Sequence, residues 1–447
     1  PFNRAADLTS SKSPTLSELQ RFGRAGRRDR PLIDWEPGSG NPRVAGVPVE
    51  GREVQCLTSR GFISNRSDLV RGLGLESGAA DFELAEGLFE RWGLAAAERI
   101  AGPFSCVLWD GAKRRLITIA DRGGAERFFY AQEGTSFLVS GAVEQILGAL
   151  PKARELDGRA VACHLAGSPV PLDATFYRSI EALAPGQLLV AGSNGLEVRD
   201  YWRLEAGEEL GLATDEEYLE ALWALLQDVC AEYFRDDEAG IALSGGLDSP
   251  VVATALDSIG GQRRLLSLRL VAPELGDSDP SGAVAASLGL EDRTVDAGAF
   301  WPLSAEGGIR TGIASPDVPI FSELQDALFK ALTEAGLQVL FTGWGGDEAF
   351  GGAAYCYPDL LLQGRWRELS RQLRAHIAKG EGGLLRILPT FLVRPLLGPL
   401  YDPIRHLYAR QPPWLTPRYR GIHRSVLGEL PKGPLILPGR RRRWQFL

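Results

Sequence analysis

The feature that most restricts the fold is an alternation of strand-like and helix-like segments between residues 215 and 341. Strands are expected at residues 240–243, 265–271 and 338–341, and helices at 215–234, 249–258, 281–288 and 322–335. Strands that alternate with helices in this way form a parallel sheet covered by helices on both faces. Thr214 and Glu217 are placed to form a capping box at the first helix. We therefore predict an α/β domain here, followed from about residue 355 by helices and long loops.

The first part of the chain has a different pattern. Short strand-like runs bounded by turn residues occur at residues 54–57, 104–109, 115–120 and 187–190, with a helix-like run at 82–92. Turn sequences after residue 110 and at residues 193–195 predict hairpins. A chain of 447 residues is too long for one ordinary core. We predict two domains, an α+β domain at residues 1–205 and the α/β domain at residues 206–447.

The composition excludes several classes of protein. A hydrophobic fraction of 44% and a charged fraction of 24% are typical of a soluble globular chain. A net charge of −8 argues against nucleic-acid binding as the main role. The apolar stretches are broken by Arg and Pro, and the start has no signal peptide, so no membrane association is expected. Five scattered cysteines without a CxxC pair indicate a reducing compartment, and we expect the cytoplasm.

The strongest motif is Ser244-Gly245-Gly246-Leu247-Asp248-Ser249, between a predicted strand and a predicted helix. Backbone N–H groups at a helix N-terminus bind phosphate oxygens, and the two glycines allow a close approach. The hydroxyl groups of Ser244 and Ser249 are further donors. The Asp248 carboxylate would repel a phosphate unless a cation lay between them, so we interpret it as a Mg²⁺ ligand.

A second glycine-rich segment is Thr342-Gly343-Trp344-Gly345-Gly346-Asp347-Glu348, which follows the predicted strand at 338–341. The carboxyl ends of parallel strands share one crevice, so the two loops are expected to meet over a single ligand. Asp347 is then a second Mg²⁺ ligand, opposite Asp248. Glu348 is expected to hold Asp347 in place or to bind the metal through water.

The pair of loops resembles the N-type ATP pyrophosphatase family, which has the motif SGGxDS and cleaves ATP between its α- and β-phosphates. The asparagine synthetase branch adds a later SGxGxDE motif. This chain departs from that motif in having Thr342 for Ser, Trp344 for an acidic residue and Gly346 for Ala. The resemblance implies ATP and Mg²⁺, with Thr342, Gly343 and Trp344 at the nucleotide. It also implies that adenine lies against the strand around Leu268 and Leu270.

The first domain resembles the class II glutamine amidotransferase domain of asparagine synthetase, which implies an Ntn-type α+β sandwich. The similarity is carried by residues 81–83, 89–93, 101–110, 115–116, 121–124, 184–187 and 201–202. The family's N-terminal Cys nucleophile is expected upstream of Pro1. Arg60 stands where the family has its oxyanion-hole Asn, and losing such a donor costs about 10² to 10³ in rate. Asp81, which would hold the glutamine amine, is retained. We predict that this domain is an inactive glutaminase.

Without released ammonia, the amine must come from another molecule or from the substrate itself. Two branches resemble that case, the β-lactam synthetases and the lasso peptide macrolactam cyclases. Residues 344–348, 315–320 and 411–415 favour the lasso cyclases. That resemblance implies an AMP-forming ligase for a precursor peptide, working with a leader-binding protein and a leader peptidase. Three alternatives are a glutamine-dependent asparagine synthetase, a β-lactam synthetase and a non-catalytic family member that binds peptide or nucleotide.

Overall fold

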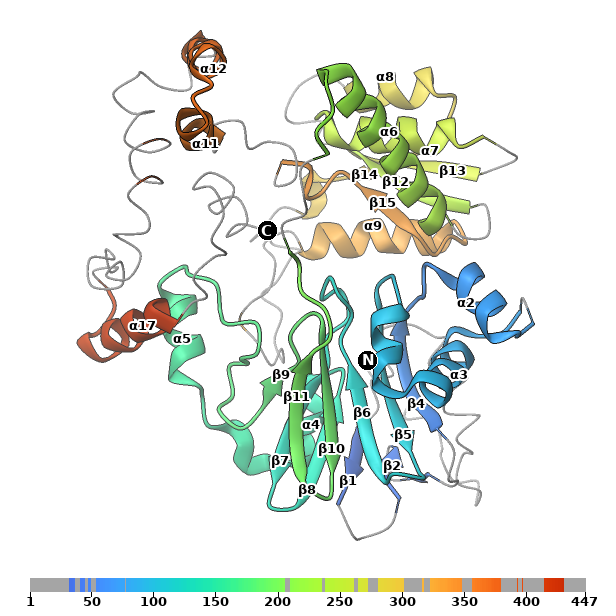
Figure 1. The fold of residues 1–447 in the computed structure, drawn as a ribbon, viewed down its shortest axis with the longest axis vertical. Helices are drawn as coiled ribbons and strands as arrows, with labels where there is room; N and C mark the ends of the chain where they lie inside the picture. The colour runs from blue at the N-terminus through green and yellow to red at the C-terminus, as the bar shows by residue number, and fades with distance from the viewer. Residues whose placement is uncertain are drawn as a thin grey trace. The chain divides into compact units, whose positions relative to one another are not determined.

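The structure is a computed structural model, and the chain forms two compact units (Figure 1). One unit holds residues 1–205 with 312–316, and the other holds 206–311 with 317–447. The described residues are 32–36, 41–44, 47–49, 54–76, 78–205, 210–234, 238–260, 264–271, 280–300, 316, 322–347, 356–378, 392, 396 and 414–429. Among them, no helix has the length and apolar character that crossing a membrane requires.

The first unit contains two antiparallel sheets. The five-stranded sheet has the order β11 (Gly195–Asp200), β10 (Gln187–Gly192), β6 (Arg115–Ile119), β5 (Phe104–Asp110) and β4 (Val54–Gly61). The six-stranded sheet has the order β3 (Val47–Pro48), β2 (Arg43–Val44), β1 (Ile33–Trp35), β8 (Ser136–Ser140), β7 (Phe129–Glu133) and β9 (Glu181–Ala182). The predicted hairpins are confirmed: Asp110 pairs with Arg115, and Gly192 pairs with Gly195.

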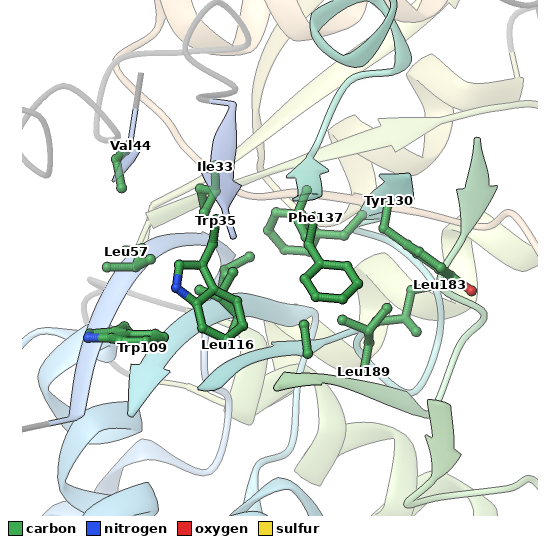
Figure 2. Packing of buried hydrophobic residues seen from close by; sticks show 14 of the residues in the cluster. Ile33, Trp35, Val44, Leu57, Trp109, Leu116, Tyr130, Phe137, Leu183 and Leu189 are labelled. Carbon is green, nitrogen blue, oxygen red and sulfur yellow. The ribbon is translucent and has the colours of Figure 1, made fainter. Parts of the chain in front are cut away.

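The core of this unit lies between the two sheets (Figure 2). Trp35 of β1 meets Trp109 of β5 edge to face, with ring centroids 5.3 Å apart and an interplanar angle of 62°. Phe137 of β8 packs against the same Trp35 ring. Aromatic pairs prefer such edge-to-face contacts, which add to the stabilisation from burial. The inner faces of both sheets therefore join in one apolar layer.

Helices cover the two outer faces. Leu84 and Leu88 of α3 (Asp81–Trp92) pack with Leu108 of β5, and η2 (Gly93–Arg99) extends that layer. On the other sheet, Ile146 of α4 (Val143–Ala149) packs with Leu138 of β8. The remaining described helices of this unit are α2 (Arg66–Leu73), η3 (Pro151–Arg154) and α5 (Gly158–Leu165). The helix–sheet–sheet–helix sandwich confirms the predicted Ntn-type fold.

The second unit is built on a parallel sheet with the order β14 (Glu291–Asp296), β13 (Arg264–Val271), β12 (Glu238–Leu243) and β15 (Leu340–Thr342). Its helices are α6 (Asp215–Tyr233), α7 (Asp248–Ser258), α8 (Pro280–Ser287), η6 (Gly298–Phe300) and α9 (Ser322–Glu334). The predicted α/β fold is confirmed. The strand β14 was not predicted, because only Val295 of its six residues is buried.

The helices lie on both faces of this sheet. Odd-numbered residues of β12, such as Ile241, pack with α6 and α7, whereas Leu266 and Leu268 of β13 pack with Leu328 of α9 on the other face. The predicted capping box is also present. The Glu217 N–H donates to Thr214 Oγ1 at 3.2 Å, and the Thr214 N–H donates to Glu217 Oε2 at 3.3 Å. The later described helices are α11 (Tyr357–Leu362), α12 (Trp366–Ala378) and α17 (Pro417–Glu429).

Candidate functional site

The two glycine-rich loops begin at neighbouring strand ends of the parallel sheet. Ala242 of β12 pairs with Thr342 of β15, so the loops that follow these strands leave the sheet at the same edge. A cavity of about 340 Å³ lies there, and both loops contribute to its wall. Open α/β sheets bind ligands at this edge, outside the carboxyl ends of the strands.

The two loops are in direct contact. A Cβ added at Gly343 would lie 2.5 Å from the backbone N of Ser249, and one added at Gly346 would lie 2.4 Å from Asp248 Cγ. Neither position has room for a side chain without a shift of its neighbour. The Asp248 side chain therefore lies against the backbone of the loop that carries Asp347.

Hydrogen bonds order the first loop. The buried Ser249 hydroxyl accepts the Ser244 N–H at 3.0 Å and lies 3.1 Å from the Ser244 hydroxyl. The Ser244 hydroxyl also accepts the Gly246 N–H, at 3.3 Å. The helix α7 starts at Asp248, so the positive end of its dipole faces the loop. A loop of this kind provides hydroxyl and backbone donors for an anion.

Hydrogen bonds within the second loop give it its turn. Thr342 Oγ1 accepts the Trp344 N–H at 3.3 Å, and the Gly346 N–H donates to the Gly343 carbonyl oxygen at 3.2 Å. Gly345 between them has a φ of +89°, which glycine adopts without strain. This geometry leaves the Trp344 side chain 68% exposed at the cavity.

The structure gathers most of the predicted site residues. The cavity is lined by Ser244, Gly246, Asp248, Ser249, Leu270, Thr342, Gly343, Trp344 and Asp347. Three of the predicted residues do not line the cavity. Gly245 faces Pro280, Leu247 is 84% exposed, and Leu268 is fully buried below Leu270 in the core shared with α9. Glu348 lies outside the described residues.

Three residues of the wall were not predicted from the sequence: Ala242, Leu243 and Leu328. Gly345, which also lines the cavity, lies within the predicted second loop but was not singled out there. Leu328 belongs to α9, and its face could have been identified from the helical spacing of Leu324, Leu328 and Leu332. Leu270 and Leu328 add apolar side chains to the lining of the cavity. Apolar lining of this kind suits a flat apolar group such as a purine.

The donor set fits a divalent cation shared with a ligand. Asp248 and Asp347 line the same cavity, and the described residues hold no cluster of three His, Cys, Asp or Glu side chains around one point. Mg²⁺ is commonly bound by one or two carboxylates together with substrate phosphates, rather than by an all-protein cage. The two carboxylates and the anion-binding loop thus suit a magnesium–phosphate pair.

A second polar cluster lies in the first unit and contains Arg60 and Asp81, the two residues that the resemblance to the amidotransferase domain singled out. Arg60 Nε donates to Glu126 Oε2 at 2.6 Å. Asp81 Oδ1 pairs with an Arg66 nitrogen at 2.6 Å, and Asp81 Oδ2 accepts the Ile63 N–H at 3.1 Å. Both the Arg60 cation and the Asp81 carboxylate therefore already have partners within the chain.

Two family models match separate parts of the chain. Residues 50–202 match the glutamine amidotransferase domain family, and residues 222–429 match the asparagine synthase family.

Individual relatives are distant and longer. The chain is 26% identical over 297 residues to "Amidase chry2" of Gibberella zeae, covering 62% of this chain and 43% of that protein. It is 29% identical over 230 residues to "Asparagine synthetase [glutamine-hydrolyzing] 3" of Bacillus subtilis, covering 48% of this chain and 37% of that protein. It is 26% identical over 324 residues to "Putative asparagine synthetase [glutamine-hydrolyzing]" of Mycobacterium tuberculosis (strain ATCC 25618 / H37Rv), covering 68% of this chain and 48% of that protein. The chain thus spans less than half the length of each of these relatives.

Proposed function

We propose that the chain is an asparagine synthetase-like protein, and that it is an ATP-dependent amide ligase that releases AMP and pyrophosphate. The observation that carries this proposal is the contact between Asp248 and the loop of Asp347 at one cavity. Two carboxylates at an anion-binding loop serve a phosphate ligand only with a bridging cation. All five cysteines are thiols rather than disulfides, which fits a reducing cytoplasm.

The proposed reaction has two steps. A substrate carboxylate oxygen attacks the α-phosphorus of ATP, the bond between that phosphorus and the bridging oxygen breaks, and pyrophosphate leaves. A neutral amine then attacks the activated carbonyl carbon, AMP leaves, and the amine loses a proton. Ser244, Ser249 and the start of α7 would bind the phosphates. Mg²⁺ held by Asp248 and Asp347 would neutralise charge on the leaving group.

Within this reaction class, we propose that the substrate supplies its own amine. The Arg60–Glu126 and Arg66–Asp81 pairs support an inactive glutaminase, which would deliver no ammonia. The substrate would be a precursor peptide whose Asp or Glu side chain is joined to its N-terminal amine, as in lasso peptide macrolactams. Holding both ends together lowers the barrier by about 7–11 kcal/mol in favourable systems. A leader-binding protein and a leader peptidase are the proposed partners.

Nucleotide binding tests the site without knowledge of the peptide. The affinity for the non-hydrolysable analogue α,β-methylene-ATP is measured by calorimetry with Mg²⁺ and with EDTA. We expect wild type to bind at least tenfold more tightly with Mg²⁺. The ratio should fall toward one in Asp248→Asn and Asp347→Asn, because each removes a cation ligand. Asp257→Asn, at the far end of α7, is the matched control. Equal magnesium dependence in all four proteins would show that these carboxylates do not hold the cation.

Substrate tests separate the alternatives. A peptide with a free N-terminus and an early Asp or Glu should stimulate ATP–pyrophosphate exchange, whereas its Asn or Gln counterpart should not. Exchange driven by aspartate, together with glutamate release from glutamine, would identify an asparagine synthetase. Exchange driven by a small β-amino acid would identify a β-lactam synthetase. Nucleotide binding without exchange on any of these substrates would favour a non-catalytic protein.

A further inference from the structure

The helix α6 carries two apolar strips, and only one of them faces a core. Cys230 is buried, and Trp223 and Leu226 are half-buried, in the core that α6 shares with α7 and β12. The other strip consists of Tyr218, Leu222, Leu225 and Val229, whose exposed fractions are 42%, 40%, 59% and 43%. Soluble proteins rarely leave a contiguous apolar surface of this kind without a binding role.

The spacing of the exposed strip matches a helix-packing seam. Its members follow one another at intervals of four, three and four residues. At 100° per residue they fall within an arc of about 60°, and at 1.5 Å per residue they extend over about 16 Å of the helix. Apolar residues at four- and three-residue spacing are the pattern by which one helix packs along another. The exposed Leu219 widens the strip at its N-terminal end.

The charges on α6 restrict what can cover this strip. The helix contains no Lys or Arg. All of its charged residues are acidic, and these are Asp215, Glu216, Glu217, Glu220, Asp228 and Glu232. Glu217, Asp228 and Glu232 follow the strip on the side away from the core. A second α6 would bring like charges together, and a nucleic acid or an anionic lipid surface would be repelled as well.

We propose that α6 is the docking surface for a basic amphipathic helix of a partner protein. Leucine-type side chains of that helix would pack between Leu222, Leu225 and Val229, and its Lys or Arg side chains would pair with the acidic flank. The surface is separate from the candidate site, since no residue of α6 lines the cavity. This role is therefore independent of the proposed ligase activity.

The test uses a fluorescein-labelled helical peptide of 18 residues with leucines at four- and three-residue spacing and flanking lysines. Anisotropy at 0.15 M salt (about an 8 Å Debye length) measures its binding to the full chain. We expect the double variant L222S/L225S to weaken binding at least tenfold. The matched control L172S/V198S changes exposed side chains of the first unit and should bind like wild type. Circular dichroism, which does not depend on the nucleotide site, reports whether each variant remains folded.

Charge reversal gives the second arm. The double variant D228K/E232K, which leaves the capping residue Glu217 in place, should lose the lysine-flanked peptide and bind a glutamate-flanked version of it. The proposal is overturned if wild type does not bind the lysine peptide, or if L222S/L225S binds it equally well. It is also overturned if charge reversal leaves the preference unchanged. A wild-type dimer that L222S/L225S dissociates would instead show that α6 pairs with a second copy.

Discussion

Replacing Gly343 by alanine tests whether the two loops share one site. The new Cβ would lie 2.5 Å from the Ser249 backbone N and 2.9 Å from Asp248 Cβ. The closer distance must lengthen by about 0.9 Å to reach the 3.4 Å at which ordinary contact begins. The backbone of Ser249 cannot rotate away as a flexible side chain would, so the loops must separate.

The expected cost follows from that displacement. A misplacement of about 1 Å can lower a rate about 10²-fold, equivalent to about 2.7 kcal/mol of transition-state stabilisation. Overpacking also costs about 1–3 kcal/mol of folding stability. Gly343→Ala should therefore slow ATP–pyrophosphate exchange about 10²-fold and weaken binding of magnesium α,β-methylene-ATP, with a modest fall in melting temperature.

The matched control is Gly148→Ala in α4, where an added Cβ meets no atom within 4 Å. Alanine in a helix is favoured over glycine by about 0.5–1 kcal/mol, so this variant should keep wild-type binding and gain stability. Circular dichroism confirms that both variants are folded. If Gly343→Ala keeps wild-type nucleotide affinity and exchange, the loops do not pack against each other as described, and the shared site is refuted.

Three further changes probe the scaffold. Trp109→Ala should cost about 3–5 kcal/mol in denaturant unfolding because the ring is fully buried, whereas the exposed Trp366→Ala should change stability by less than about 0.5 kcal/mol. Thr214→Ala should cost about 0.5–2 kcal/mol by the same assay through loss of the α6 cap, and an unchanged midpoint would contradict that role. Burial raises the pKa of the Glu86 carboxyl despite its bond from the Cys56 N–H, so its charge costs stability as pH rises through the folded-state pKa. Glu86→Gln should therefore gain melting temperature over wild type at neutral pH and lose that gain in acid; a constant difference across pH would contradict the assignment.

The parallel sheet and its loops were predictable because their signals are local. The apolar run ending at Leu243 and the glycines after it specify a strand, a turn and a helix start within one short segment. The polar strand β14 carries no such signal, since its place in the sheet comes from pairing with β13. The same limit applies to the cavity wall. Leu268 and Leu270 lie two positions apart and so share one face of their strand. Only the assembled fold shows that Leu270 lines the cavity, whereas Leu268 is buried in the core.

In the first unit, the hairpins could be predicted from the sequence, but none of the six strands of the six-stranded sheet was predicted. Four of these strands, β1, β2, β3 and β9, have only two or three residues and so lack a periodic pattern. The resemblance identified Arg60 and Asp81 as residues of interest. Their partners Glu126 and Arg66 become visible only when strands and helices are packed together.

Pairing β12 with β15 joins two halves of a cavity that are nearly a hundred positions apart along the chain. Neither half can hold a triphosphate in an unfolded chain, so a nucleotide bound there would also show that β12 and β15 have paired. By mass action, ligand at about 100 times its dissociation constant would add about 2.7 kcal/mol to the folded state. ATP in the cell would then help to keep this unit folded, whether or not the protein also catalyses the formation of an amide bond.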